Sequence, residues 1–186
     1  MRTEQQYFED ALPLEKYMAQ MEVHQEKSYQ VYERFELPED EAFFDLLREK
    51  QPHVLAITED WCGDAMMNNP ILRKVAERAD LEIRCVYRDQ NLELMDRYLT
   101  NGGRSIPKYI ILSSTGEVLG TWGPRAPQIQ EFVMTEKAKL PDPDDARFEL
   151  QQKAFHSDLT ERFASSEEFW QLVYEDLRNT FREALK

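Results

Sequence analysis

The sequence has 186 residues and a formal net charge of −13; 41% of its residues are hydrophobic and 32% are charged. This length favours one domain with appendages. The negative charge argues against nucleic acid and anionic membranes as partners, because both attract clustered Lys and Arg. No apolar run approaches the roughly 18–20 residues that span a bilayer, and the polar segment 1–7 lacks the apolar core of a signal peptide. We therefore expect a cytoplasmic protein.

Residues 1–36 are predicted to form a helical N-terminal extension. Thr3 and Gln6 fit a capping box at the start of a first helix, and Pro13 suits the first turn of a second one. Apolar side chains then recur at helical spacing around a polar break near residues 26–27; they are Leu14, Tyr17, Met18, Met21, Tyr29 and Tyr32. This pattern indicates packing on a main domain rather than a groove for a partner.

Residues 37–137 are predicted to form the main domain, in which strands and helices alternate. A helix begins after Pro38 with acidic residues in its first turn, where the helix dipole favours negative charge, and it ends near Pro52. Pro70 lies inside the next helix and should kink it. The predicted strands are 53–58, 81–87, 109–112 and 117–122, and the later helices are 62–79, 91–99 and 128–137.

Residues 138–186 are predicted to form a helical C-terminal extension. Segment 140–145 is a linker by its Pro and Asp content. Ser165 and Glu168 then fit a capping box ahead of an amphipathic helix whose apolar residues are Phe169, Leu172, Val173, Leu177, Phe181 and Leu185. We expect these residues to pack on the core of the same chain, with a homodimer through the C-terminal helices as the second possibility.

Cys62 lies where the apolar strand 53–58 leads into the long helix. Backbone N–H groups are unpaired at a helix N-terminus and the helix dipole is positive there, so a thiol loses its proton more easily. A lone cysteine beside apolar segments is otherwise more often a small buried hydrophobe. Glu59, Asp60 and Asp64 surround Cys62 and disfavour its thiolate. The sequence therefore leaves the direction of the Cys62 pKa shift open.

The order of these elements, with Trp61-Cys62-Gly63 opening the long helix, resembles the thioredoxin superfamily. That family has an α/β fold, a central mixed sheet flanked by helices. The resemblance covers about residues 36–137. Further matches are Pro70 eight residues after Cys62, Asp89-Gln90-Asn91, Ile106-Pro107 at the position of the family's cis-proline, Gly116-Glu117-Val118 and Gly123.

Two positions depart from the thioredoxin pattern. Ala65 stands where the family has a second cysteine, and Ala56 stands where it has a buried acid. Cys85 is not an obvious substitute, because it lies on the apolar face of another strand and is more often a core thiol there. The dithiol couple is therefore missing, together with the usual proton acceptor.

The resemblance then implies a thiol–disulfide oxidoreductase with Cys62 as its single catalytic cysteine. A lone thiolate attacks a disulfide and stays in a mixed disulfide until another thiol releases it. The backbone N–H groups of Gly63, Asp64 and Ala65 would stabilise the thiolate, and Trp61 and Ile106-Pro107 would contact the substrate. That substrate is a protein or a low-molecular-weight thiol or disulfide, and the reaction needs no cofactor.

Two other functions stay open at this stage: a redox-inactive binding module that kept the groove, and a sensor that oxidises Cys62 to a sulfenic acid. A zinc site is not expected, because His24, His53 and His156 have no ligand partners at suitable spacing. Arg88 and Arg104 flank the presumed active face and are candidates to bind an anionic substrate, although a solvated arginine is the commoner case.

Overall fold

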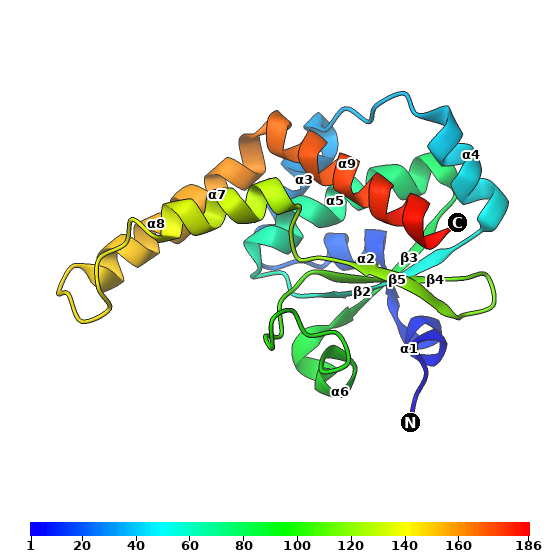
Figure 1. Ribbon diagram of the computed structural model, residues 1–186, viewed down its shortest axis with the longest axis horizontal. Coiled ribbons are helices and arrows are strands. Elements are labelled where there is room, and N and C mark those ends of the chain that lie inside the picture. Colours follow the sequence, from blue (N-terminus) through cyan, green and yellow to red (C-terminus); the bar gives the residue numbers. More distant parts are fainter.

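The centre of the fold is a five-stranded sheet with strand order β1-β3-β2-β4-β5 (Figure 1). The computed structural model describes all of residues 1–186. Only β2 and β3 are parallel; the other neighbouring strands pair antiparallel. The sheet is therefore mixed, as expected from the sequence. Its strands are β1 Leu12–Pro13, β2 His53–Thr58, β3 Glu82–Tyr87, β4 Lys108–Leu112 and β5 Val118–Trp122.

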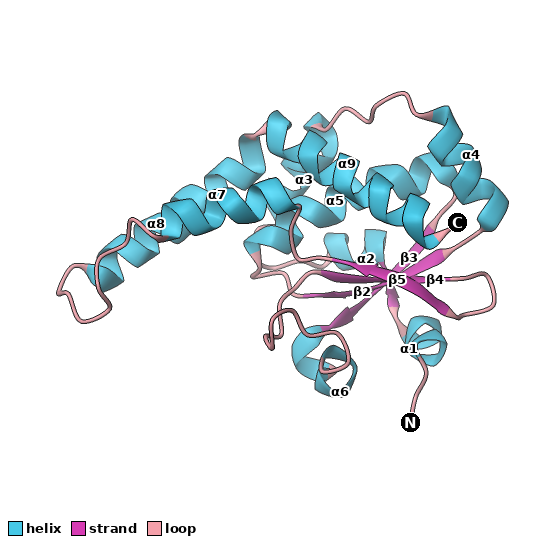
Figure 2. Ribbon diagram, in the orientation of Figure 1, coloured by secondary structure: helices cyan, strands magenta, loops and turns pink.

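Helices cover both faces of this sheet (Figure 2). Most of them lie on one face, while α1 and α6 lie on the other. The helices are α1 Glu4–Asp10, α2 Leu14–Ala19, α3 Gln25–Arg34, α4 Glu41–Lys50, α5 Gly63–Ala79, the short 3₁₀ helix η1 Arg88–Gln90, α6 Leu92–Met95, α7 Pro127–Lys137, α8 Phe148–Ser165 and α9 Glu167–Ala184. None of them combines the length and the apolar character needed to cross a bilayer.

Strand β2 divides the hydrophobic core into two clusters. Val54 and Ala56 belong to the larger cluster, whereas Leu55 and Ile57 belong to the smaller one. Successive side chains of a strand point to opposite faces, so a strand buried on both faces is a continuous apolar run, as predicted for residues 53–58. The C-terminal end of β2 leads directly into the turn that carries Cys62.

The N-terminal segment differs from the expected all-helical extension. Leu12–Pro13 forms the edge strand β1, opposite Arg84 and Cys85 of β3; proline is tolerated there because an edge strand needs fewer backbone donors. The capping box of Thr3 and Gln6 is confirmed by both of its hydrogen bonds. The helical stretch is interrupted earlier than the polar residues 26–27 suggest. Those residues lie inside α3, and the chain turns before it, at residues 20–24.

Two further elements differ from the sequence prediction. The helix expected over 91–99 is shorter: it consists of the single turn of α6, which η1 precedes. The cap of α9 is Ser166 and not Ser165: the Ser166 side chain accepts from the Phe169 N–H at 3.2 Å. Ser165 instead ends α8 and donates to the Glu161 carbonyl at 2.7 Å. The one-residue difference arises because α8 runs into α9 with no linker between them.

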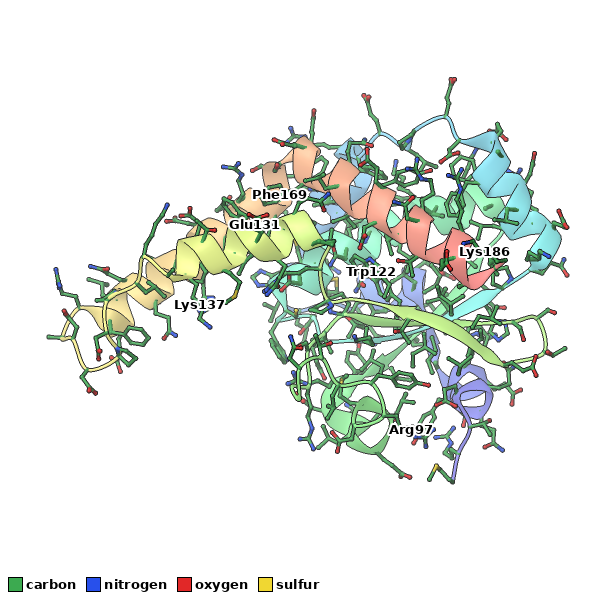
Figure 3. The ribbon with its side chains drawn as sticks, viewed as in Figure 1. Arg97, Trp122, Glu131, Lys137, Phe169 and Lys186 are labelled. Carbon is green, nitrogen blue, oxygen red and sulfur yellow. The ribbon has the colours of Figure 1, made fainter.

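Helices α7 and α8, with residues 138–147 between them, form a hairpin that projects from the body of the molecule (Figure 1). We call this hairpin the arm. Helix α9 then turns back along the body, where the apolar side chains of its inner face are buried against α5 and β5. Trp122 of β5 fixes this contact by donating its indole N–H to Asp176 at 2.6 Å, and Figure 3 shows Trp122 below α9.

Candidate active site

Cys62 is the residue immediately before α5, with extended backbone dihedral angles. The turn from β2 closes when the Cys62 N–H donates to the Glu59 carbonyl at 3.3 Å. The residue is only 9% exposed, and its Sγ lies 3.4 Å from the carbonyl oxygen of Ile106, to which the thiol donates. The expected position at a strand-to-helix junction is confirmed, and the thiol there is buried.

Burial decides the protonation state of this thiol. Loss of water contact, and to a smaller extent the nearby Asp64 carboxylate, raise the pKa of Cys62 to about 12. The backbone N–H groups of Ala65 and Asp64 and the guanidinium of Arg125 lower this pKa, but by less. From the sequence, only the helix terminus and the nearby carboxylates could be weighed against each other. Desolvation has a larger effect on the Cys62 pKa than either of them.

Only one of the three acids near Cys62 in the sequence acts on its thiol. Asp60 points away and accepts from the backbone N–H groups of Glu22 at 2.9 Å and Val23 at 3.2 Å. Glu59 accepts from the Asp89 N–H at 3.1 Å. Asp64 remains, and its carboxylate is held by Arg125. The expected cluster of free negative charge around Cys62 is therefore not formed.

Arg125 is the site residue that the sequence reasoning missed. Its guanidinium donates to both carboxylate oxygens of Asp64, at 2.7 and 2.9 Å, and to Gln130 at 2.8 Å. Burial raises the pKa of Asp64, while the Arg125 hydrogen bonds oppose that rise. The only signal in the sequence was the Gly123-Pro124 break after the last strand, which did not show that the following residue returns to α5.

Two proline loops form the wall beside the thiol. The Ile106–Pro107 and Gly123–Pro124 peptide bonds are both cis. Gly123 has φ 123°, and a Cβ atom there would lie 2.1 Å from the Pro107 carbonyl oxygen, so this contact requires glycine. The Lys108 ammonium bridges the Gly123 carbonyl, at 3.0 Å, and the Thr100 hydroxyl, at 2.8 Å, which holds the loops together.

Cys62 lies between two hollows of the surface. The first, of about 720 Å³, separates the N-terminus of α5 from the arm, and we call it the arm cleft. The second, of about 660 Å³, is bounded by the two proline loops, and we call it the loop cleft. Trp61, Cys62, Asp64 and Arg125 line both of them. A disulfide held across this point has room for one half on each side of the thiol.

The arm contacts the first turn of α5. A Cβ atom at Gly63 would lie 3.4 Å from the Thr160 hydroxyl and 3.9 Å from the Phe163 ring, both on α8. The C-terminal extension therefore covers part of the face on which Cys62 lies. Trp61 remains 47% exposed at the rim, with the Arg88 guanidinium 4.9 Å above its ring.

A neutral hydrogen-bond chain lies behind the site, near Ala56, which stands where the thioredoxin pattern has a buried acid. The Tyr109 hydroxyl donates to Asn69 at 2.6 Å, and the Asn69 amide donates to Thr58 at 3.1 Å. Tyr17 bonds the same Thr58 hydroxyl at 3.2 Å. These side chains satisfy one another without a titratable carboxylate, so this layer offers no acceptor for the thiol proton.

Cys85 is separate from this site. It is 3% exposed and belongs to the larger core cluster, whereas Cys62 belongs to the smaller one. Burial raises the pKa of Cys85 well above the usual range. The interpretation of Cys85 as a core thiol is confirmed.

The remaining candidates fall into two groups. His24 and His156 both line the arm cleft, although the sequence suggested that the histidines are scattered; His53 packs on the ring of Phe8. No group of three or more His, Cys, Asp or Glu side chains converges as metal ligands. Of the two arginines near the site, Arg104 is bound to both carboxylate oxygens of Asp96, at 2.8 and 3.0 Å.

Comparison with known proteins agrees with this fold. A crystal structure of a protein of unknown function from Pseudomonas aeruginosa superimposes with a TM-score of 0.71 at 14% identity, covering 99% of each chain. An HIV epitope scaffold superimposes with a TM-score of 0.59 at 15% identity, covering 94% of this chain and 99% of the other. No curated protein matches significantly. The family model for thioredoxin matches residues 11–141, which includes the N-terminal strand and extends beyond the expected limits of 36–137. The chain therefore belongs to the thioredoxin family.

Proposed function

We propose that this protein is a cytoplasmic thiol–disulfide oxidoreductase in which Cys62 alone forms the covalent intermediate. The observation that carries the proposal is the position of its Sγ. It lies at the N-terminus of α5, 3.4 Å from the Ile106 carbonyl, where the arm cleft and the loop cleft meet. A substrate disulfide bound across both clefts places a sulfur atom next to the thiol.

The exchange balances with one thiol and one disulfide. Cys62 loses its proton, and its sulfur attacks one sulfur of the substrate disulfide. A bond forms between the two sulfurs, the substrate S–S bond breaks, and the departing thiolate takes the electron pair and then a proton. The products are a mixed disulfide at Cys62 and one free thiol. A second thiol from solution reverses the step and regenerates Cys62.

The chain itself offers no way to release the mixed disulfide. Ala65 occupies the position from which a second cysteine would attack, and Cys85 lies in the other core cluster. Tyr109, Asn69 and Thr58 form a neutral chain where the family has a carboxylate. The intermediate should therefore last until an external thiol arrives, which favours mixed disulfides of proteins or small thiols as the substrates.

A second candidate is a binding module without redox activity, and one observation favours it. The raised pKa of Cys62, about 12, leaves little thiolate at neutral pH. A bound substrate offsets this, because holding a disulfide against the sulfur gives a high effective concentration. A sulfenic-acid sensor needs the same thiolate without such binding, so the raised pKa weighs more heavily against it.

The test is adduct formation with a neutral disulfide. The reduced, folded protein is incubated at pH 8 with 4,4′-dithiodipyridine and its intact mass is measured. We expect one thiopyridine adduct per chain, located at Cys62 by peptide mapping and removed by dithiothreitol. The Cys62→Ser variant should form none while folded. If the folded wild-type protein forms no adduct although the unfolded chain forms two, the exchange mechanism is wrong and the binding module remains.

A further inference from the structure

The charge around Cys62 is opposite to the charge of the whole chain. The protein carries 36 acidic residues and 23 Lys and Arg residues. The acidic residues that line the arm cleft and the loop cleft are only Asp64 and Glu161, whereas five basic residues line them, namely Lys27, Arg88, Arg104, Arg125 and Lys137. Arg88 and Arg104 in the loop cleft are paired with Asp89 and Asp96, so the unpaired positive charge lies in the arm cleft, where it attracts anions.

Both acidic residues are already neutralised by partners. Arg125 holds the two carboxylate oxygens of Asp64, at 2.7 and 2.9 Å. Lys27 lies 3.1 Å from the Glu161 carboxylate across the arm cleft. Each of the two acids is therefore paired with a cation. The basic side chains of the arm cleft that have no carboxylate partner are Lys137, His24 and His156.

Lys137 is the cation best placed to select a ligand. It is the last residue of α7 and has no carboxylate within ion-pair distance. Figure 3 shows its side chain on the underside of the arm, away from the body of the helix. Next to it, Met134, Phe155 and Leu159 give the arm cleft an apolar wall. An apolar surface with one free cation suits a ligand that combines carbon atoms with a carboxylate.

We propose that the substrate of Cys62 is a low-molecular-weight disulfide whose halves carry carboxylates, with the carboxylate in the arm cleft bound by Lys137. This proposal rests on the exchange function above and names its substrate class. Volumes of about 720 and 660 Å³ hold one small-molecule half each. The half whose sulfur bonds to Cys62 stays, and the other half departs as a thiolate with the electron pair and takes up a proton.

Two aromatic disulfides separate charge from reactivity. 5,5′-Dithiobis(2-nitrobenzoate) carries one carboxylate on each half, whereas 4,4′-dithiodipyridine carries none. The measured quantity is the ratio of the two second-order rate constants at Cys62, with the anionic reagent as the numerator. A change in the pKa of Cys62 affects both reagents alike and cancels in this ratio.

The expected result is a loss of preference for the anionic reagent when Lys137 is changed. The ratio should fall about two- to fivefold in Lys137→Gln and further in Lys137→Glu, as for an exposed charge pair. It should also fall as salt is raised from 20 to 500 mM, because salt screens exposed charges. Lys139→Gln is the matched control: Lys139 is two residues away and pairs with Glu136, and it does not line the arm cleft.

The outcomes distinguish the two proposals. A ratio that stays constant in Lys137→Gln, Lys137→Glu and high salt, with both reagents still reacting at Cys62, contradicts the anionic substrate and leaves the exchange function intact. An equal fall in Lys139→Gln also contradicts it, because net charge rather than Lys137 would then set the preference. No reaction of Cys62 with either reagent contradicts the exchange function, and the substrate class with it.

Discussion

The two cysteines show how differently one fold treats the same side chain. Burial raises the pKa of both thiols, so neither is ionised at neutral pH. Cys85 lies in the middle of β3, between β1 and β2, and is enclosed by the larger core cluster. Cys62 lies beyond the end of β2, where the arm cleft and the loop cleft meet. The two thiols therefore differ in how a ligand can reach them and not in their acidity.

The surroundings of the two thiols lead to the same conclusion. Cys85 is enclosed by the larger core cluster, whereas Cys62 has a carbonyl acceptor, two helix N–H groups and the Asp64–Arg125 pair beside it. A polar surrounding can respond to a ligand, since hydrogen bonds and charges rearrange when water is displaced.

The largest expected effect is the pH dependence of alkylation. Below its pKa, the thiolate fraction rises tenfold per pH unit, so the rate at Cys62 should rise about 1,000-fold between pH 7 and pH 10. Iodoacetamide labelling followed by peptide mass spectrometry measures each cysteine separately. Cys85 should react only after unfolding. A Cys62 rate that levels off near pH 9 would show that burial does not control this thiol.

A second cysteine at position 65 should allow the chain itself to release the adduct from Cys62. In Ala65→Cys the new thiol lies three residues from Cys62, in the first turn of α5. An intramolecular thiol has a high effective concentration, so the lifetime of a thiopyridine adduct should fall about 100-fold. Ala65→Ser is the control, and intact mass against time is the measurement. An adduct that persists equally in both variants would mean that residue 65 cannot reach the mixed disulfide.

Breaking the neutral hydrogen-bond chain behind the site should lower the stability of the fold without changing the reactivity of Cys62. Tyr109→Phe removes the donor to Asn69 and leaves that buried oxygen without a partner, which costs about 1–3 kcal/mol. Urea unfolding measures the loss. Tyr7→Phe, at a buried tyrosine whose hydroxyl has no protein partner, should cost less. A large fall in the alkylation rate of folded Tyr109→Phe would show that this layer also controls Cys62.

The smallest expected effect is removal of the one carboxylate that acts on Cys62. The Asp64 carboxylate raises the pKa of Cys62, so Asp64→Asn should lower this pKa and increase alkylation at pH 8 about threefold. Asp60→Asn is the control, because Asp60 bonds to the N–H groups of Glu22 and Val23 instead. An equal increase in both variants would indicate a general effect of net charge.

The sequence by itself determined the elements that have strong local signals. The apolar run of β2 and the helical spacing in α5 fixed the strand-to-helix junction at Cys62, because periodicity and burial are coded residue by residue. The α/β thioredoxin fold is confirmed by the sheet order and by the family match over residues 11–141. The core position of Cys85 followed from its place on the apolar face of a strand.

The tertiary structure alone decided what surrounds the thiol. The edge strand β1 has two residues and no periodicity to detect, so only its pairing with β3 defines it. Arg125 reaches Asp64, and the arm reaches Gly63, across separations of about 60 and 100 residues. Desolvation of Cys62 depends on atoms from β2, α5 and the Ile106 loop together. Local sequence carries no record of such contacts, which is why it left the sign of the Cys62 pKa shift open.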